Sequence, residues 1–292
     1  MIIFILMLLI ILLITNNDIV LAGSTYGLML WYENLLPLLL PFMLISGLIE
    51  KQIFKMCTTS GKNAKLAISS TLLLGMFCGY PIGAKTNAYF TQNKLINKQI
   101  GNLILPISNN VSPMFFLGFI LSSTLKNNIN PLPAYVALYI PYITFIILEL
   151  LVLKPNTRYN QPKKAQSNIH NQENQSISQQ SINQITMVGL YVMICSIITE
   201  FVLSTNIINH YLKLFIIGAT EITRGVTYIY QVPLFDIKIK TALILGFTSF
   251  GGISSVMQTS KVIQGSGLSL LHYITVKLLC AICTFYLYLL LI

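Results

Sequence analysis

Apolar residues run in long blocks along most of the chain, and short polar stretches separate the blocks. A helix of about 20 apolar residues crosses a bilayer core about 30 Å thick. The pattern therefore predicts an all-α polytopic membrane protein with about eight transmembrane segments. The apolar blocks lie at residues 1–24, 27–50, 66–90, 100–124, 131–153, 185–204, 211–231, 239–262 and 268–292.

Composition and charge agree with this prediction. The chain has 54% hydrophobic residues, 9% charged residues and a mean hydropathy of +0.72, which is outside the range of soluble globular domains. Its 18 basic residues outnumber the 8 acidic ones and cluster between the apolar blocks. Basic clusters in such places orient membrane proteins, so they predict a multi-pass protein of the cell membrane and no nucleic-acid partner.

The first block, residues 1–24, has two interpretations. The apolar run followed by Val20-Leu21-Ala22 is compatible with a cleaved secretion signal. No basic residue precedes the run, however, and a signal peptide normally begins with one. We therefore expect a retained N-terminal transmembrane helix.

A polar linker at residues 154–184 divides the rest of the chain into two halves, 25–153 and 185–292. The linker is rich in Asn, Gln and Ser, and it cannot bury enough apolar surface to fold. Weak similarity relates the halves: PFMLISGLIE (41–50) aligns with YVMICSIITE (191–200), and TLLLGMFCGYPIGAK (71–85) with ALILGFTSFGGISSV (242–256). These matches predict an internal repeat, with Glu50 and Glu200 in equivalent places.

Glycine and proline interrupt the apolar blocks 66–90 and 239–262. Residues 66–78 would rise only about 20 Å as a helix, too little to cross the bilayer core. Lysines lie on both sides of block 66–90, and a full crossing would place these clusters on opposite membrane faces. The sequence therefore predicts two re-entrant helical hairpins in two inverted repeats, with the linker and the lysine clusters in the cytoplasm.

Non-helical backbone within a membrane must be surrounded by protein or by a water-filled cavity. We therefore expect a binding site at the interruptions, where N–H groups at helix starts and lysine ammonium groups attract an anion. Ile82, Gly83 and Ala84 would supply such N–H groups after Pro81. The predicted substrate-binding residues are Gly79, Tyr80, Pro81, Gly83 and Lys85, then Asn109, Asn110 and Ser112, and then Ser249, Gly251, Gly252, Ser254, Gln258 and Lys261.

Each of these features also has a structural interpretation. Small residues form close-packed helix surfaces, intramembrane asparagines join helices, and Lys85 and Lys261 could extend to the membrane surface. Glu221 and Arg224 predict either ion coupling or an internal ion pair. With Lys213, they also make segment 211–231 compatible with either a spanning or an interfacial placement.

The sequence predicts no catalysis, metal or cofactor. It contains no Ser-His-Asp or Cys-His arrangement and no P-loop, and its three histidines and five cysteines are scattered. The remaining prediction is a carrier of a small anionic solute in the lipid bilayer.

GMFCGYPIGAKT (75–86), NNVSPMFFLGFI (109–120), EITRG (221–225) and SFGGISSVMQT (249–259) resemble the sporulation integral membrane protein YlbJ family, also called SpoVV. This family is related to the nucleoside-recognition Gate domain, and the resemblance extends from about residue 27 to the end. It implies transport of dipicolinic acid during endospore formation, in the mother-cell or outer forespore membrane.

Two alternatives stay open from the sequence. A nucleoside or nucleobase carrier would prefer Asn, Gln and Ser contacts over lysines. A non-transporting sporulation assembly factor would need no solute site. A homo-oligomer and sporulation membrane partners are compatible with either, and the energy source and the direction of transport have no signal in the sequence.

Overall fold

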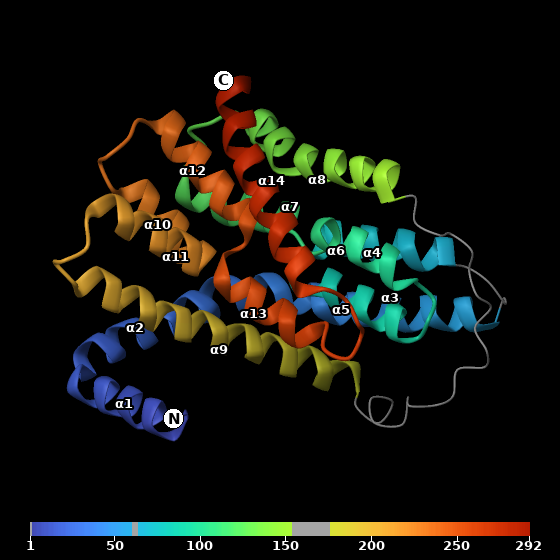
Figure 1. Ribbon diagram of the computed structural model, residues 1–292, viewed down its shortest axis with the longest axis horizontal. Helices are drawn as coiled ribbons and strands as arrows, with labels where there is room; N and C mark the ends of the chain where they lie inside the picture. The colour runs from blue at the N-terminus through green and yellow to red at the C-terminus, as the bar shows by residue number, and fades with distance from the viewer. Residues whose placement is uncertain (1, 60–63, 154–175) are drawn as a thin grey trace.

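The computed structural model describes residues 2–59, 64–153 and 176–292, and this part of the chain is helical without any strand (Figure 1). Most elements are α-helices, and η1 and η2 are π-helical. In chain order they are α1 (Ile2–Thr15), α2 (Asn17–Leu30), η1 (Trp31–Leu35), α3 (Leu36–Thr59), α4 (Ala64–Cys78), α5 (Ile82–Gln92), α6 (Lys98–Ser108), α7 (Pro113–Phe115), η2 (Phe116–Thr124), α8 (Pro131–Leu153), α9 (Ile177–Ser204), α10 (His210–Thr220), α11 (Ile222–Gln231), α12 (Ile237–Phe250), α13 (Gly252–Val262) and α14 (Leu270–Leu291).

Six stretches of the described chain are long and apolar enough to cross a membrane, in agreement with a multi-pass membrane protein. The sequence pattern predicts about eight segments, so the two counts differ. The six stretches are Asn17–Cys57, Lys98–Thr124, Pro131–Val152, Ile177–Ser204, Ile237–Val262 and Leu270–Leu291.

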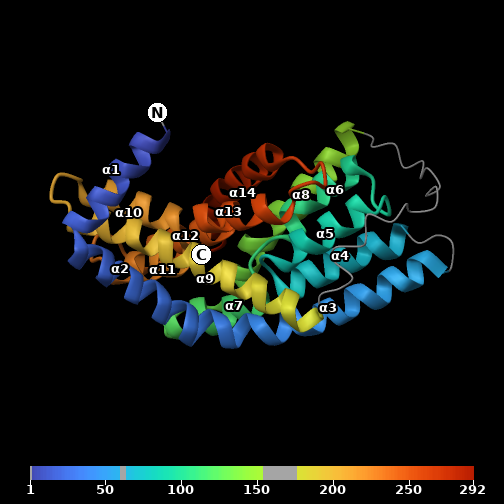
Figure 2. The ribbon, with the colours of Figure 1, turned by 90° about the horizontal axis from the view of Figure 1, so that it is seen from below.

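The same order of elements occurs twice. A long helix (α3 or α9) is followed by two short helices packed against each other (α4 and α5, or α10 and α11). An interrupted helix (α6 to η2, or α12 to α13) and a second long helix (α8 or α14) complete each half. The α4–α5 pair and the α10–α11 pair lie at opposite ends of the long axis of the molecule (Figures 1 and 2).

The second short-helix pair lies at 210–231, whereas the sequence predicts the second hairpin at 239–262. Residues 237–262 form α12 and α13, which do not pack along each other as the arms of a hairpin do. Gly251 alone separates them, so the glycine signal marks an interruption of a crossing helix. The equivalent of segment 71–85 is therefore the α10–α11 region, not segment 242–256.

Two other predicted boundaries change. Block 1–24 is two helices, because Asn16 ends α1 after 14 residues, a rise of about 21 Å. α9 begins at Ile177, inside the predicted linker, because the Ser176 hydroxyl accepts a hydrogen bond from the Gln179 N–H and caps the helix. Linker residues 154–175 lie outside the described part of the chain.

Glycines set the spacing within both short-helix pairs. A Cβ atom added at Gly75 or Gly83 would collide with the carbonyl oxygen of Ser108 on α6. In the second pair, a Cβ added at Gly225 would come within 2.7 Å of the Gly218 Cα. Both pairs thus depend on a glycine in each arm for their close packing.

One helical path, from α2 through η1 into α3, is much longer than a bilayer core. Its candidate spanning stretch has 41 residues, a rise of about 62 Å. Figure 2 shows this path curving along one side of the molecule. Gly23 and Gly27 let α2 approach the backbone of α9, where an added Cβ would lie 2.7 and 2.8 Å from the Ile197 and Met193 Cα atoms.

Candidate functional site

Four interruptions of helical structure meet around one cavity of about 60 Å³. They are the turn 79–81 between α4 and α5, the stretch 109–112 between α6 and α7, Glu221 between α10 and α11, and Gly251 between α12 and α13. The polar residues and glycine that line the cavity are Tyr80, Ser112, Glu221, Thr223, Gly251, Ser254, Ser255 and Gln258. The structure thus gathers six of the sequence-predicted residues, from four distant segments, at one place.

The turn between α4 and α5 depends on Gly79, which has a φ of +73°. This left-handed conformation favours glycine. An added Cβ there would also approach the Ser112 N to 2.8 Å, so the turn packs directly on the second interruption. The Gly79 carbonyl accepts hydrogen bonds from the N–H groups of Ile82 and Gly83 at 3.0 and 3.3 Å. Two of the N–H groups that the sequence predicts to face an anion are therefore already bonded.

Lys277 on α14 contacts this turn, and its side chain is completely buried. Its Nζ donates hydrogen bonds to the Tyr80 hydroxyl at 2.6 Å and to Asn110 Oδ1 at 3.1 Å. The Nζ also lies 4.9 Å from the ring centroids of both Tyr80 and Tyr142. No carboxylate of the described residues forms an ion pair with Lys277.

Two asparagines extend the polar cluster around Lys277. Asn109 Nδ2 donates to Thr259 Oγ1 at 2.8 Å and to the Tyr273 hydroxyl at 3.1 Å. Asn109 Oδ1 and Asn110 Nδ2 are buried without a hydrogen-bond partner. Buried polar atoms are nearly always hydrogen-bonded, so these two atoms are suited to contact a polar ligand.

The opposite wall of the cavity carries a carboxylate. Glu221 is 3% exposed and forms the N-cap of α11, where its Oε2 accepts hydrogen bonds from the Arg224 N–H at 2.9 Å and from the Thr223 hydroxyl. Ser254 and Gln258 on α13 line the same cavity, and neither side chain forms a hydrogen bond with another described residue. The cavity therefore has one acidic wall and one wall with free amide and hydroxyl groups.

Three predicted charged residues lie away from the cavity. Lys85 on α5 pairs with Glu50 of α3 at 3.5 Å, and Thr86 donates to the same carboxylate. The Arg224 side chain pairs with Glu200 of α9 rather than with Glu221. Lys261 is exposed in the last turn of α13. The equivalent glutamates Glu50 and Glu200 thus each hold a cation on the second arm of the following helix pair.

The remaining predicted residues have structural contacts. Ser249 accepts a hydrogen bond from the Tyr142 hydroxyl through its carbonyl at 2.6 Å. The Ser112 hydroxyl accepts from the Phe115 N–H and caps α7. Pro81 is the N-cap residue of α5, and Gly252, with a φ of +74°, begins α13. These residues shape the interruptions that border the cavity.

Lys277, Tyr142 and Tyr273 are absent from the sequence-based prediction, whereas Tyr80 is part of it. A signal for Lys277 was present, because it is a lone lysine inside a 22-residue apolar helix, and ionisable residues in such helices usually have a function. Tyr142 and Tyr273 carry no comparable signal, because buried tyrosines are common in helices of this composition. Only the fold brings them to Lys277.

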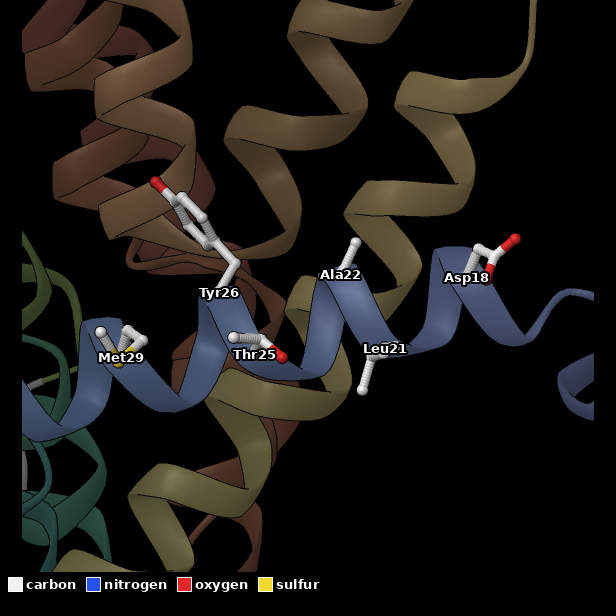
Figure 3. Close-up of a pocket in the computed structure, with 6 residues that line it drawn as sticks. All are labelled: Asp18, Leu21, Ala22, Thr25, Tyr26 and Met29. Atoms are coloured by element: carbon white, nitrogen blue, oxygen red, sulfur yellow. The ribbon is translucent and has the colours of Figure 1, made fainter.

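A second concavity, of about 540 Å³, lies along α2 (Figure 3). All six lining residues come from this one helix, and Tyr26 points toward the neighbouring helices. The Arg224 guanidinium lies 4.3 Å from the Tyr26 ring centroid. The concavity brings no second element to a ligand, so we place no site there.

Comparisons of the chain with models of protein families, with curated proteins and with solved structures find no match.

Proposed function

We propose that this protein is a membrane transporter for a small carboxylate solute. The observation that carries the proposal is the buried Lys277, which pairs with no carboxylate of the described residues. It lies where the turn between α4 and α5 meets the stretch between α6 and α7. A buried charge is costly unless it is paired. A carboxylate solute would supply the missing partner.

The arrangement of the helices supports alternating access. Two short-helix pairs at opposite ends of the molecule would enter the membrane as re-entrant hairpins from opposite faces, as inverted repeats do. Their tips and both interrupted helices border one cavity. A single site between two inverted halves can be reached from either face in turn.

The hydrogen-bonding groups near Lys277 suit a carboxylate. An ammonium has three N–H donors, and Lys277 uses two of them for Tyr80 and Asn110. The Asn110 Nδ2 group offers a further unpartnered donor. The cavity of about 60 Å³ is well below the roughly 300 Å³ of a small ligand pocket, so solute binding requires the Tyr80 turn to move outward.

Dipicolinate is the first solute to test. It is a small planar dianion, and the resemblance of the sequence motifs to the YlbJ family implies it as the substrate in endospore formation. The proposed location is accordingly a cell membrane of the sporulating mother cell, with the lysine-rich helix ends in the cytoplasm.

A neutral polar solute, such as a nucleoside, is the second candidate. The observation in its favour is the pair Ser254 and Gln258, whose hydroxyl and amide groups face the cavity without partners. Such groups recognise the edges of uncharged bases and sugars through hydrogen bonds.

The test is uptake of labelled dipicolinate, with uridine in parallel, into proteoliposomes that contain the purified full-length chain. We expect the parent protein to take up dipicolinate and not uridine. Lys277→Met, which keeps a long side chain but removes the charge, should abolish uptake. Lys65→Met makes the same change at an exposed lysine and should leave uptake unchanged.

Other outcomes of the uptake experiment would favour a different function. Uptake of uridine alone would favour the nucleoside carrier, and flux of neither solute would favour an assembly factor. If folded Lys277→Met still takes up dipicolinate, Lys277 is not part of the solute-binding site. Folding of each variant is checked by size-exclusion chromatography in detergent.

A further inference from the structure

Four buried or partly buried glutamates of the described residues differ in how they are compensated. Glu50 pairs with Lys85, and Glu200 pairs with Arg224. Glu149 on α8 lies 2.7 Å from His272. Glu221 alone among these four carboxylates has no basic side chain in ion-pairing distance, and it is one of the two that are fully buried.

The partners of Glu221 are a hydroxyl and a backbone N–H, both of which it needs as the N-cap of α11. The Arg224 guanidinium, on the same helix, is turned toward Glu200 and the Ser196 carbonyl. The titratable or charged side chains that face Glu221 are Arg224, Glu200 and Cys195, Tyr26 on α2, and Cys78 and Tyr80 across the cavity. The only cation among them is already paired.

Glu221 and Lys277 are both connected to the same cavity. Glu221 lines the cavity directly, and Lys277 reaches it through the Tyr80 hydroxyl. Ser254 and Gln258, both more than nine-tenths buried and without hydrogen-bond partners, lie in the same lining. These unpartnered groups are available to a polar ligand in the space next to Glu221.

A carboxylate solute in this cavity would add negative charge beside an unneutralised carboxylate in a water-poor environment. Like charges at such a site disfavour each other's ionised form. Uptake of one proton by Glu221 removes this repulsion. Solute binding and proton binding would then strengthen each other by the same factor, which is the requirement for coupling.

We propose, on the basis of the proposed transport function, that Glu221 binds the coupling proton and that the protein moves its carboxylate solute together with that proton. The proton binds a Glu221 carboxylate oxygen when the solute enters. It leaves the same oxygen after the site has opened to the other side of the membrane. Glu221 remains the cap of α11 in both forms, because a protonated carboxyl still has an acceptor oxygen for the Arg224 N–H.

The experiment uses proteoliposomes of the full-length chain loaded with a pH-sensitive dye, with the membrane potential held at zero by potassium and valinomycin. Addition of dipicolinate outside should acidify the interior. With one proton per solute, an inward gradient of one pH unit should drive about tenfold accumulation. Exchange of labelled for unlabelled dipicolinate is measured in the same vesicles, because exchange needs no net proton movement.

Three variants separate coupling from capping. Glu221→Gln keeps an acceptor for the cap and should retain exchange while losing acidification and accumulation. Glu221→Asp keeps an ionisable cap and should restore acidification, whereas Glu221→Asn, also a good cap, should not. Glu33→Gln makes the same change as Glu221→Gln at an exposed glutamate and should behave as the parent.

The proposed function and the coupling can fail separately. Exchange by the parent without acidification, dependence on sodium in place of protons, or acidification by Glu221→Gln would overturn the coupling and leave the transporter intact. Absence of exchange by the parent would overturn the transport function and the coupling with it.

Discussion

The Lys277 ammonium donates a hydrogen bond to the Tyr80 hydroxyl at 2.6 Å, across a separation of 197 positions in the chain. This contact joins the turn of the first helix pair to the last helix of the second half. It also places a neutral oxygen where the proposed solute would put a carboxylate oxygen. The contact therefore predicts competition between Tyr80 and the solute for Lys277.

Tyr80→Phe tests this competition. Without added solute, the variant should be less stable by about 1–3 kcal/mol, because the buried Lys277 loses a partner. Added dipicolinate should raise its melting temperature more than that of the parent, because the solute no longer displaces the hydroxyl. A smaller rise than in the parent would mean that Tyr80 holds the solute rather than competing with it.

Gly83→Ala tests the close packing of the first helix pair. The added Cβ would collide with the Ser108 carbonyl, and overpacking of this kind costs about 1–3 kcal/mol. We expect a lower melting temperature in detergent. Gly118→Ala is the matched control, since no atom lies within 4 Å of its added Cβ. Equal melting temperatures for the two variants would contradict the packing.

The Glu50–Lys85 pair should contribute to stability rather than to solute recognition. A double-mutant cycle with Glu50→Gln and Lys85→Met should give a coupling energy of about 0.5–3 kcal/mol in thermal or denaturant unfolding. The apparent KM for dipicolinate should not change in Lys85→Met. A large rise in the apparent KM of Lys85→Met without loss of stability would mean that Lys85 belongs to the binding site, as the sequence predicts.

Cys78 is a native probe of the cavity, because it lines the cavity at the end of α4. In a background without the other cysteines, a water-soluble thiol reagent should label Cys78 slowly, and dipicolinate should slow the labelling further. Cys57 alone serves as the control, because it belongs to a separate apolar cluster with Ala67 and Phe90. Its labelling should not respond to dipicolinate.

The opposite placement of the two helix pairs predicts their topology in the membrane. In a cysteine-free background, a cysteine at Gln99 should react with an impermeant reagent only after the membrane is permeabilised, because the lysine-rich end should face the cytoplasm. A cysteine at Ile207, which is 94% exposed between α9 and α10, should react in intact cells. Reaction of both from the same side would exclude inverted repeats.

The sequence predicts much of this structure because apolar block length is a strong local signal. The α8 and α14 boundaries lie close to the predicted blocks 131–153 and 268–292, and the interruptions at Gly79, Asn109 and Gly251 lie where glycine and polar residues predict them. The element that the sequence misassigns is the second helix pair, because α10 and α11 meet at a single residue, Glu221, without proline or paired glycines at the turn.

The site is predictable only in part, for a physical reason. Residues at backbone interruptions leave a local signal, so Tyr80, Ser112, Ser254 and Gln258 could be proposed from the sequence. Pairing between charges is not local, and the sequence alone cannot tell that Lys85 is neutralised by Glu50 while Lys277 is not. Which lysine is paired with a carboxylate is visible only in the packing of α3 and α14.

The length of the path from α2 to α3 has a consequence for the surrounding lipid. A straight helix of about 62 Å would have to tilt about 60° to remain inside a core of about 30 Å, beyond the tilts of 0–40° that membrane helices adopt. Part of the path must therefore lie outside the hydrocarbon core, in the headgroup layer or in water. Because Glu50 of α3 pairs with Lys85 of α5, the depth of this path in the bilayer is linked to the depth of the first helix pair.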